Sequence, residues 1–124
     1  MSGNSYLLDT NAIIALLSGN DLLTNTLKNA GRIGVSIISV IEFYLFSKLS
    51  KGDKTLFDTL LQRIEMINIS ADFDQILSVA NLRVKNKLKL PDAIIADCAM
   101  QSRLTLVTND KHFSKINNLQ ILTF

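Results

Sequence analysis

The stretch Tyr6-Leu7-Leu8-Asp9-Thr10-Asn11-Ala12 decides the fold of this chain. A short apolar run ends abruptly at Asp9, and apolar residues with helical spacing follow at Ile13, Ile14 and Leu17. The run of residues 5–8 predicts a short buried strand, and the spacing after it predicts an amphipathic helix. A strand that leads directly into a helix is the first half of a βαβ unit.

Three later segments repeat this pattern of an apolar run followed by an acidic residue. Residues 35–38 lead to Ser39 and Glu42, residues 88–91 lead to Asp92, and residues 104–107 lead to Thr108-Asn109-Asp110. In a parallel sheet, the loops that leave the carboxyl ends of the strands line the ligand crevice. We therefore expect the four acids to gather at one edge of a sheet.

Strands and helices are expected to alternate along the whole chain. The predicted strands are residues 5–8, 35–38, 66–69, 105–107 and 119–122. The clearest predicted helices are residues 21–29, a stripe at 56–64, a long helix that reaches Lys87, and residues 93–101. This alternation predicts an α/β protein with a three-layer α/β/α fold and a mostly parallel central sheet.

Length and composition indicate one compact domain spanning residues 1–124. Hydrophobic residues make up 48% of the chain and charged residues 19%, and the net charge of +2 neither requires nor excludes a nucleic-acid partner. Cys98 is the only cysteine, which excludes an intramolecular disulfide and a zinc site made of thiolates. We expect a cytoplasmic protein with no membrane partner, since no secretory signal or membrane-length apolar run is visible.

Several carboxylates at one sheet edge repel each other. Two unit charges 4 Å apart cost about 4 kcal/mol at an effective dielectric constant of 20, so the acids either bind protons or hold a cation. Ligand sets made only of oxygen suit Mg²⁺ or Mn²⁺. Such an ion can activate a water and orient a phosphodiester, so the implied reaction is phosphodiester hydrolysis by metal-activated water.

Two of the acids also fit ordinary roles at the start of a helix. Asp9 can cap the first helix, although Thr10 would serve equally well. Glu42 follows Ser39 with the spacing of a capping box. The coincidence of four acids at one edge, rather than any one of them, favours a site.

The other acids are open to similar alternatives. Asp92 follows Pro91, a common helix start where negative charge is favoured, and Asp110 fits a turn. Asp97 lies about 140° further round the helix from Asp92, so it is a candidate fifth acid that either approaches the cluster or faces solvent. Its flanking residues Ala96 and Cys98 indicate that it is not freely exposed. His112, the only histidine, is expected to be a surface residue beside Phe113.

A group of basic residues lies close to the predicted acids. Its members are Arg83, Lys85, Lys87, Lys89 and Lys111, with Lys115 a little further on. Those near Lys87 fit the C-terminus of a helix, where the helix dipole favours positive charge. They equally fit RNA binding, in which lysine and arginine contact phosphates.

Four short motifs together resemble one known family. They are Leu7-Leu8-Asp9-Thr10-Asn11, Ser39-x-x-Glu42, Pro91-Asp92-Ala93-Ile94-Ile95-Ala96 and Leu106-Val107-Thr108-Asn109-Asp110-x-x-Phe113. Their order and spacing resemble PIN domains, in particular the VapC-type toxins of type II toxin–antitoxin systems. The resemblance covers nearly the whole chain, from Tyr6 to Phe124.

The resemblance implies a Mg²⁺- or Mn²⁺-dependent endoribonuclease on a PIN-like fold. It carries over Asp9, Glu42, Asp92 and Asp110 as the catalytic acids, of which Asp9, Asp92 and Asp110 are the expected metal ligands. The supporting polar positions are Thr10, Asn11, Ser39, Thr108 and Asn109. The family further implies a homodimer, an RNA substrate and a cognate antitoxin whose tail enters the active-site groove, and the apolar helix near residues 43–49 fits that contact.

Two positions depart from the family pattern, and the residues bear on two other functions. Asp97 stands where a small apolar residue is common, and His112 stands where an acid is common. A phosphatase with Asp9 as nucleophile would need an acid at position 11, where this chain has Asn11. A degenerate PIN fold that only binds RNA or protein is disfavoured by the four intact acids.

Overall fold

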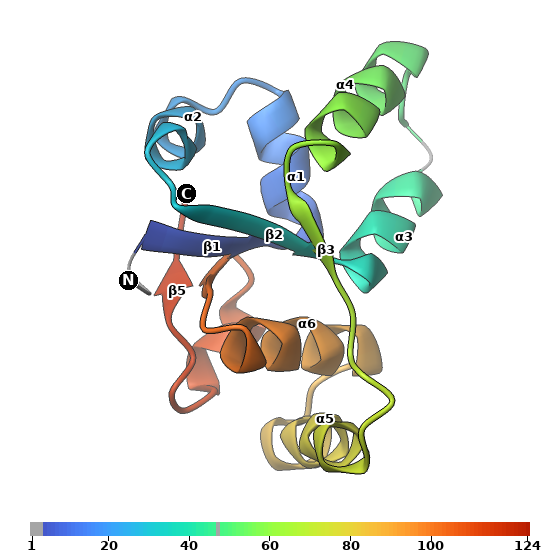
Figure 1. Ribbon diagram of the computed structural model, residues 1–124, viewed down its shortest axis with the longest axis vertical. Coiled ribbons are helices and arrows are strands. Elements are labelled where there is room, and N and C mark those ends of the chain that lie inside the picture. Colours follow the sequence, from blue (N-terminus) through green and yellow to red (C-terminus); the bar gives the residue numbers. More distant parts are fainter. Residues whose placement is uncertain (1–3, 47) are drawn as a thin grey trace.

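The computed structural model describes residues 4–46 and 48–124 and contains a five-stranded sheet (Figure 1). The strands are β1 (Ser5–Leu8), β2 (Arg32–Ser36), β3 (Glu65–Ile67), β4 (Thr105–Val107) and β5 (Ile121–Leu122). Their order is β3-β2-β1-β4-β5, and every neighbouring pair is parallel. The predicted α/β fold with a mostly parallel sheet is therefore confirmed.

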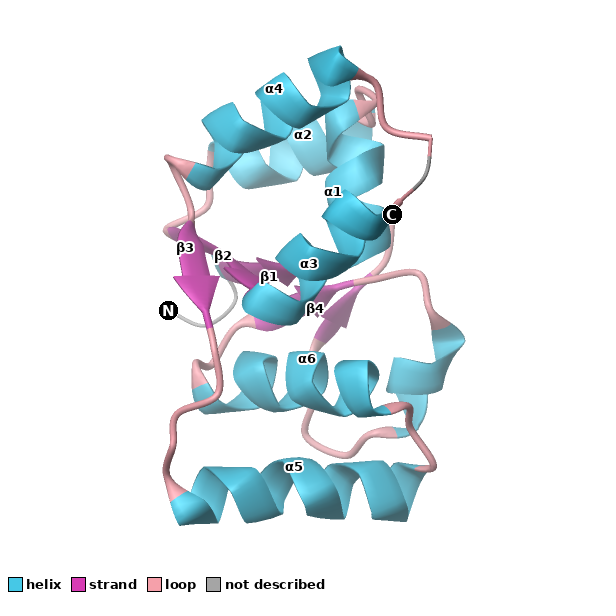
Figure 2. Ribbon diagram, turned by 90° about the vertical axis from the view of Figure 1, so that its right-hand side faces the viewer, coloured by secondary structure: helices cyan, strands magenta, loops and turns pink. Residues whose placement is uncertain are grey.

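Helices cover both faces of the sheet (Figures 1 and 2). One face carries α1 (Thr10–Leu17), α2 (Asp21–Lys28), α3 (Ile37–Leu45) and α4 (Lys51–Leu61). On the other face, α6 (Leu90–Gln101) lies next to the sheet, and α5 (Phe73–Asn86) packs on the outer side of α6. A 3₁₀ helix, η2 (Lys111–Lys115), follows β4.

Two hydrophobic cores correspond to the two faces. Leu8, in β1, packs with α1 and α3 residues such as Ile13 and Phe43, whereas its neighbour Leu7 packs with α6 residues and with Leu106. Successive side chains of a strand point to opposite faces, so a strand that is apolar throughout is expected when both faces are covered. Gly34 in β2 is closely packed, since a Cβ there would lie 2.7 Å from the end of the Ile67 side chain, which would have to move.

The boundary between β2 and α3 differs from the sequence prediction. The strand was expected at residues 35–38, but β2 begins at Arg32 and ends at Ser36. Ser36 is the N-cap of α3, and its hydroxyl accepts a hydrogen bond from the Ile38 N–H at 3.2 Å. Because this serine can cap, the β-branched residues that follow it join the helix despite their preference for strands.

The strand order reverses beside β1, which lies between β2 and β4. Leu8 pairs with Val35 on one side and with Val107 on the other, so these three strands end at the same edge. This reversal is the topological switch point at which open α/β sheets bind ligands. Within the part of the chain that the structure describes, no helix has the length and apolar character that crossing a membrane requires.

Candidate active site

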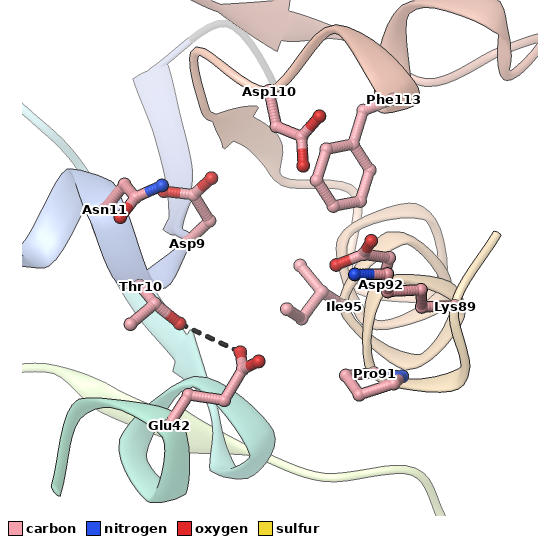
Figure 3. A pocket seen from close by; sticks show the side chains of 10 residues that line it. All are labelled: Asp9, Thr10, Asn11, Glu42, Lys89, Pro91, Asp92, Ile95, Asp110 and Phe113. Carbon is pink, nitrogen blue, oxygen red and sulfur yellow. Dashed lines mark hydrogen bonds between the residues drawn. The ribbon is translucent and has the colours of Figure 1, made fainter. Parts of the chain in front are cut away.

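A pocket of about 300 Å³ lies at the switch point of the sheet (Figure 3). All four predicted acids line it, and they come from four separate segments of the chain. The complete lining is Asp9, Thr10, Asn11, Glu42, Lys89, Pro91, Asp92, Ile95, Asp110 and Phe113. The structure therefore brings together residues that lie more than a hundred positions apart in the sequence, such as Asp9 and Asp110.

Asp9 immediately follows β1 and is only 5% exposed. Its Oδ1 accepts a hydrogen bond from the Ala12 N–H at 2.7 Å, which makes Asp9 the N-cap of α1. The expectation that Thr10 could cap this helix equally well was wrong, because Thr10 already lies inside the helix. Asp9 thus combines a structural role at the start of α1 with a position in the pocket.

The surroundings of Asp9 favour its neutral form. Burial is the main reason that the pKa of this carboxyl is raised above 3.8, and the charges of Asp110 and Asp92 act in the same direction. Hydrogen bonds from the Thr108 hydroxyl and the Ala12 N–H oppose this rise in pKa. The negative charge on Asp9 is therefore stabilised by two donors but held close to two other acids.

Thr10 holds Glu42 at the opposite side of the pocket. The Thr10 hydroxyl donates a hydrogen bond to Glu42 Oε1 at 2.9 Å, as the dashed line in Figure 3 shows. The predicted capping box between Ser39 and Glu42 was wrong, since Ser36 caps α3 and Ser39 lies inside the helix. Ser39 is fully buried and does not line the pocket; among the described residues, its hydroxyl has no hydrogen-bond partner.

Asp92 lies in the first turn of α6, where the helix dipole favours a negative charge. Burial nevertheless raises the pKa of its carboxyl, and the charges of Asp110 and Glu42 raise it further. Lys89 and His112 act in the opposite direction. The charge of Asp110 raises the pKa of both Asp9 and Asp92, so these carboxylates are close enough to repel one another.

Asp110 is positioned by the loop that leaves β4. Its N–H donates a hydrogen bond to the Thr108 hydroxyl at 3.0 Å, and Thr108 in turn donates to Asp9. Asp110 Oδ1 accepts a hydrogen bond from the His112 N–H at 2.9 Å, and His112 Nδ1 lies 2.8 Å from the same oxygen. Buried Thr108 therefore connects the acids that follow two neighbouring strands.

The remaining predicted polar residues have different roles. Asn11 lines the pocket. Asn109 does not line it: its Nδ2 donates to the Phe124 carbonyl at 2.6 Å, and its Oδ1 accepts from the Phe124 N–H at 2.8 Å. These two bonds extend the pairing of β4 and β5 and fix the loop that carries Asp110.

Asp97 is not part of the pocket. It is 1% exposed and lies between α5 and α6, where Oδ1 accepts a hydrogen bond from the Ser78 hydroxyl at 2.6 Å and Oδ2 accepts one from Gln75 Nε2 at 3.0 Å. The alternative position beside the acids is not observed, whereas the expectation from its flanking residues that Asp97 is not freely exposed is confirmed. Residue 97 is fully buried because α6 is covered by the sheet on one side and by α5 on the other.

Of the predicted basic residues, only Lys89 lines the pocket. Arg83 and Lys85 lie in the last turn of α5, and Lys87 caps that helix in a left-handed conformation with φ 53°. Lys111 is exposed at the start of η2. Arg83, Lys85 and Lys87 therefore lie at the C-terminus of α5, where the helix dipole favours positive charge, as one interpretation of the sequence expected. Phosphate binding stays a prediction for Lys89.

Two features of the site were missed at the sequence level. Ile95 and Phe113 form an apolar wall of the pocket, and only the Asp-x-x-Phe spacing after β4 pointed to Phe113. The expected surface position of His112 is observed, but its contact with Asp110 was not foreseen. The spacing of two residues from a turn aspartate is the signal that would have indicated this contact.

The donor set of the pocket fits a hard divalent cation. Its acidic ligands are carboxylates, which Mg²⁺ and Mn²⁺ prefer. Neighbouring carboxylates raise the pKa of Asp9 and of Asp92, and a cation would relieve this repulsion. In the described ranges 4–46 and 48–124, no three His, Cys, Asp or Glu side chains are yet arranged to hold a metal ion together. Asp9, Asp92 and Asp110 are the residues that would do so.

A parallel α/β sheet with an acidic pocket at its switch point defines the class of this protein. The PIN domain model matches residues 6–119. The chain therefore belongs to the PIN-domain family, as its motifs suggested. No curated protein sequence matches it.

Solved structures show the same fold over nearly the full length. A chain of the VapBC2 complex from Rickettsia felis, bound to a DNA fragment from their promoter, is 29% identical with a TM-score of 0.80, covering 96% of this chain and 98% of that one. A chain of a toxin–antitoxin complex from Klebsiella pneumoniae is 32% identical with a TM-score of 0.78, covering 96% and 97%. A chain of DNA-bound VapBC from Salmonella typhimurium is 20% identical with a TM-score of 0.77, covering 96% and 97%, which is a likeness of fold alone.

Proposed function

We propose that this protein is the toxin of a VapBC-type toxin–antitoxin pair and acts as a metal-dependent endoribonuclease. The observation that carries the proposal is the convergence of Asp9, Glu42, Asp92 and Asp110 on one pocket at the sheet edge. Membership of the PIN-domain family and the likeness to chains of toxin–antitoxin complexes support the same assignment.

Three carboxylates are proposed to hold Mg²⁺ or Mn²⁺. Asp9 accepts hydrogen bonds from the Ala12 N–H and from Thr108, which fix its carboxylate where it lines the pocket. Asp110 is fixed by Thr108 and His112, and Asp92 enters from the first turn of α6. A bound divalent ion supplies Lewis-acid activation of water and stabilises negative charge on a phosphodiester.

Glu42 is proposed to act on the nucleophilic water from the opposite side of the pocket. The Thr10 hydroxyl fixes Oε1, so Oε2 is the atom that would orient the water or accept its proton. Lys89 would bind a phosphate oxygen of the RNA, since it lines the same pocket and its charge already acts on Asp92.

The direct test is RNA cleavage by purified protein that carries no antitoxin. We expect cleavage of a mixed RNA substrate with Mg²⁺ or Mn²⁺, loss of cleavage with EDTA, and loss in the Asp9→Asn variant. Asparagine keeps the side-chain oxygen that caps α1, so this variant should fold. Asp72→Asn is a matched control, because Asp72 is exposed, makes no side-chain capping bond and lies outside the pocket.

Two results would contradict the nuclease assignment. Equal cleavage by wild type and Asp9→Asn would point to a contaminating nuclease. RNA binding without cleavage, unchanged in Asp9→Asn, would instead favour a PIN-fold binding module.

The antitoxin is proposed to cover the apolar surface of α3 beside the pocket. Ile41, Tyr44 and Leu45 on α3 and Phe46 after it are all exposed, and Glu42 on the same helix lines the pocket. A segment bound there would bury apolar surface and lie next to the acids. Co-expression with the product of a neighbouring small gene should yield a complex that Leu45→Glu weakens.

A further inference from the structure

The two sides of the acidic pocket differ in the positive charge around them. On the α1–α3 side, neither helix contains a lysine or an arginine. The opposite side, here the α6–η2 side, is formed by the start of α6 and the loop after β4 (Figure 3). Lys89 lines the pocket there, and Lys111 is exposed at the start of η2, directly after Asp110. A polyanion such as RNA would therefore be attracted to the α6–η2 side.

His112 adds an aromatic ring to the α6–η2 side. Its Nδ1 lies 2.8 Å from Asp110 Oδ1, while 70% of the side chain is exposed. His112 also lowers the pKa of Asp92, so the ring is near that carboxyl as well. The ring does not line the pocket itself. It therefore stands at the rim, beside two of the acids that do.

The fold does not need the His112 ring for packing. The short helix η2 is anchored by Phe113, which is 1% exposed in the core, and by the hydrogen bond from the His112 backbone N–H to Asp110. Both contacts would remain if the ring were removed. A ring that is so largely exposed offers a face on which a nucleobase can stack, and histidine is one of the side chains that bind RNA bases in this way.

The exposed rings on the α1–α3 side are placed differently. Tyr44 on α3 donates a hydrogen bond from its hydroxyl to Asp58 on α4, and Phe46 follows the end of α3. Neither ring lines the pocket, and no cation of α3 accompanies them. His112 is therefore the exposed ring that lies on the same side of the pocket as Lys89.

We propose that His112 is an RNA-binding residue, whose ring stacks on the base of a nucleotide adjacent to the phosphate that enters the pocket. Lys89 would contact that phosphate, and Lys111 would contact another phosphate further along the strand. Since every base has a flat face, the stacking contact adds affinity without requiring one particular base. The inference rests on the proposed function, because it assigns a role in the binding of the same RNA.

The test compares two fluorescently labelled oligomers of about ten nucleotides, one an oligoadenylate and the other an abasic ribose-phosphate chain of equal charge. Binding is measured by fluorescence anisotropy with the Asp9→Asn variant in EDTA, which prevents cleavage. The remaining acids repel both oligomers equally, so the comparison isolates the bases. We expect oligoadenylate to bind about tenfold more tightly than the abasic chain. Equal binding of the two oligomers, or binding of neither, would overturn the proposal.

Substitutions of His112 in the same Asp9→Asn chain separate stacking from a role in holding Asp110. His112→Ala should remove the preference for oligoadenylate and leave the affinity for the abasic chain unchanged. His112→Phe keeps a ring and should keep the preference. His112→Asn keeps a side-chain donor but has no ring, so it should behave like His112→Ala. A preference that survives in His112→Asn and is lost in His112→Phe would contradict stacking, because His112 would then act through Asp110.

Lys111→Ala is the matched control at the neighbouring position. It removes a charge and no ring, so it should weaken the binding of both oligomers by the same factor. If Lys111→Ala instead removed the preference for oligoadenylate, the preference would not come from the His112 ring. None of these measurements requires RNA cleavage. Cleavage by wild type without any preference for bases would contradict this inference alone, whereas a preference in a chain that never cleaves RNA would contradict only the proposed nuclease activity.

Discussion

Asp9 and Asp97 are both buried carboxylates, but they lie in opposite surroundings. Asp97 sits between two helices and accepts hydrogen bonds from two neutral side chains, Ser78 and Gln75. Asp9 sits at the edge of the sheet, where Asp92 and Asp110 raise its pKa in addition to the effect of burial. Burial of an acid is therefore not enough to indicate a site.

What distinguishes the two acids is the nature of their neighbours. A buried carboxylate that is surrounded by donors is satisfied, and it stabilises the contact between the elements that supply those donors. A buried carboxylate that faces other carboxylates lowers stability unless something positive joins it. A cluster of buried carboxylates that lowers stability is therefore a better indicator of a functional site than a satisfied one. This criterion selects the pocket around Asp9 and not the space between α5 and α6.

The largest expected difference between the two regions is in RNA cleavage. Asp92→Asn and Asp110→Asn should each reduce the rate of cleavage by about 10²–10³-fold, the loss typical of removing one group that stabilises charge in a transition state. Asp97→Asn should stay within about threefold of wild type when assayed well below its melting temperature. A large loss in Asp97→Asn with intact folding would mean that the two regions are functionally connected.

The next largest difference is in folding stability. Asp97→Ala should lower the free energy of unfolding by about 2 kcal/mol, because it leaves two partly buried donors without their acceptor. Urea unfolding measures this change. Asp9→Asn should cause no loss under the same metal-free conditions, since the cap of α1 survives and a repulsive charge is removed. A clear loss of stability in metal-free Asp9→Asn would contradict the clustered-acid description of the pocket.

Magnesium should stabilise the pocket but not the contact between α5 and α6. At a Mg²⁺ concentration ten times the dissociation constant, binding to the native state adds about 1.4 kcal/mol. We expect this gain in wild type and in Asp97→Asn, seen as a rise in melting temperature that EDTA reverses. Asp9→Asn should show a much smaller rise, and an equal rise in that variant would place the ion elsewhere.

The smallest expected effect is a pH dependence of the metal-free protein. The pKa values of Asp9 and Asp92 are raised in the folded state, so the native protein binds these protons more readily than the unfolded chain. The loss of folding stability caused by these two charged carboxylates is greatest at neutral pH. It decreases as the pH falls through the folded pKa values and is gone below the unfolded value of about 3.8. The advantage of Asp9→Asn over wild type should therefore shrink as the pH is lowered. If the difference in stability between Asp9→Asn and wild type instead grew as the pH was lowered, the pKa of Asp9 would be lowered in the folded state and not raised.

Much of the fold was accessible from the sequence because both faces of the sheet are covered. Continuous apolar runs such as residues 5–8 and 105–107 are read directly as buried parallel strands, and both were predicted with their observed limits. The start of α3 was missed because Ile37 and Ile38 have the composition of a strand. Their helical state depends on the cap provided by Ser36, which is a local hydrogen bond that composition does not reveal.

The four acids of the pocket were also accessible, because each stands at a boundary between elements. The residues that hold these acids in place could not be predicted. The hydrogen bonds from Thr10 to Glu42 and from Thr108 to Asp9 join segments that are far apart in the chain. Asp97 shows the limit most clearly. Its position on a helix was correctly predicted, but its surroundings depend on α5 packing outside α6, which no periodicity within α6 encodes.

The central place of β1 in the sheet also has a consequence for the timing of folding during synthesis. Asp9 is among the first residues made, yet its N–H bonds to the Val107 carbonyl, and Asp110 lies beyond that strand. At roughly 5–20 residues per second, several seconds separate the synthesis of the first acid from that of the last. An incomplete chain on the ribosome can already form the pairing of β1 with β2, but it lacks Asp110 and with it a complete pocket. Under the proposed function, the growing chain should therefore not cleave RNA until β4 has docked, and the proposed antitoxin would have time to bind the regions made earlier.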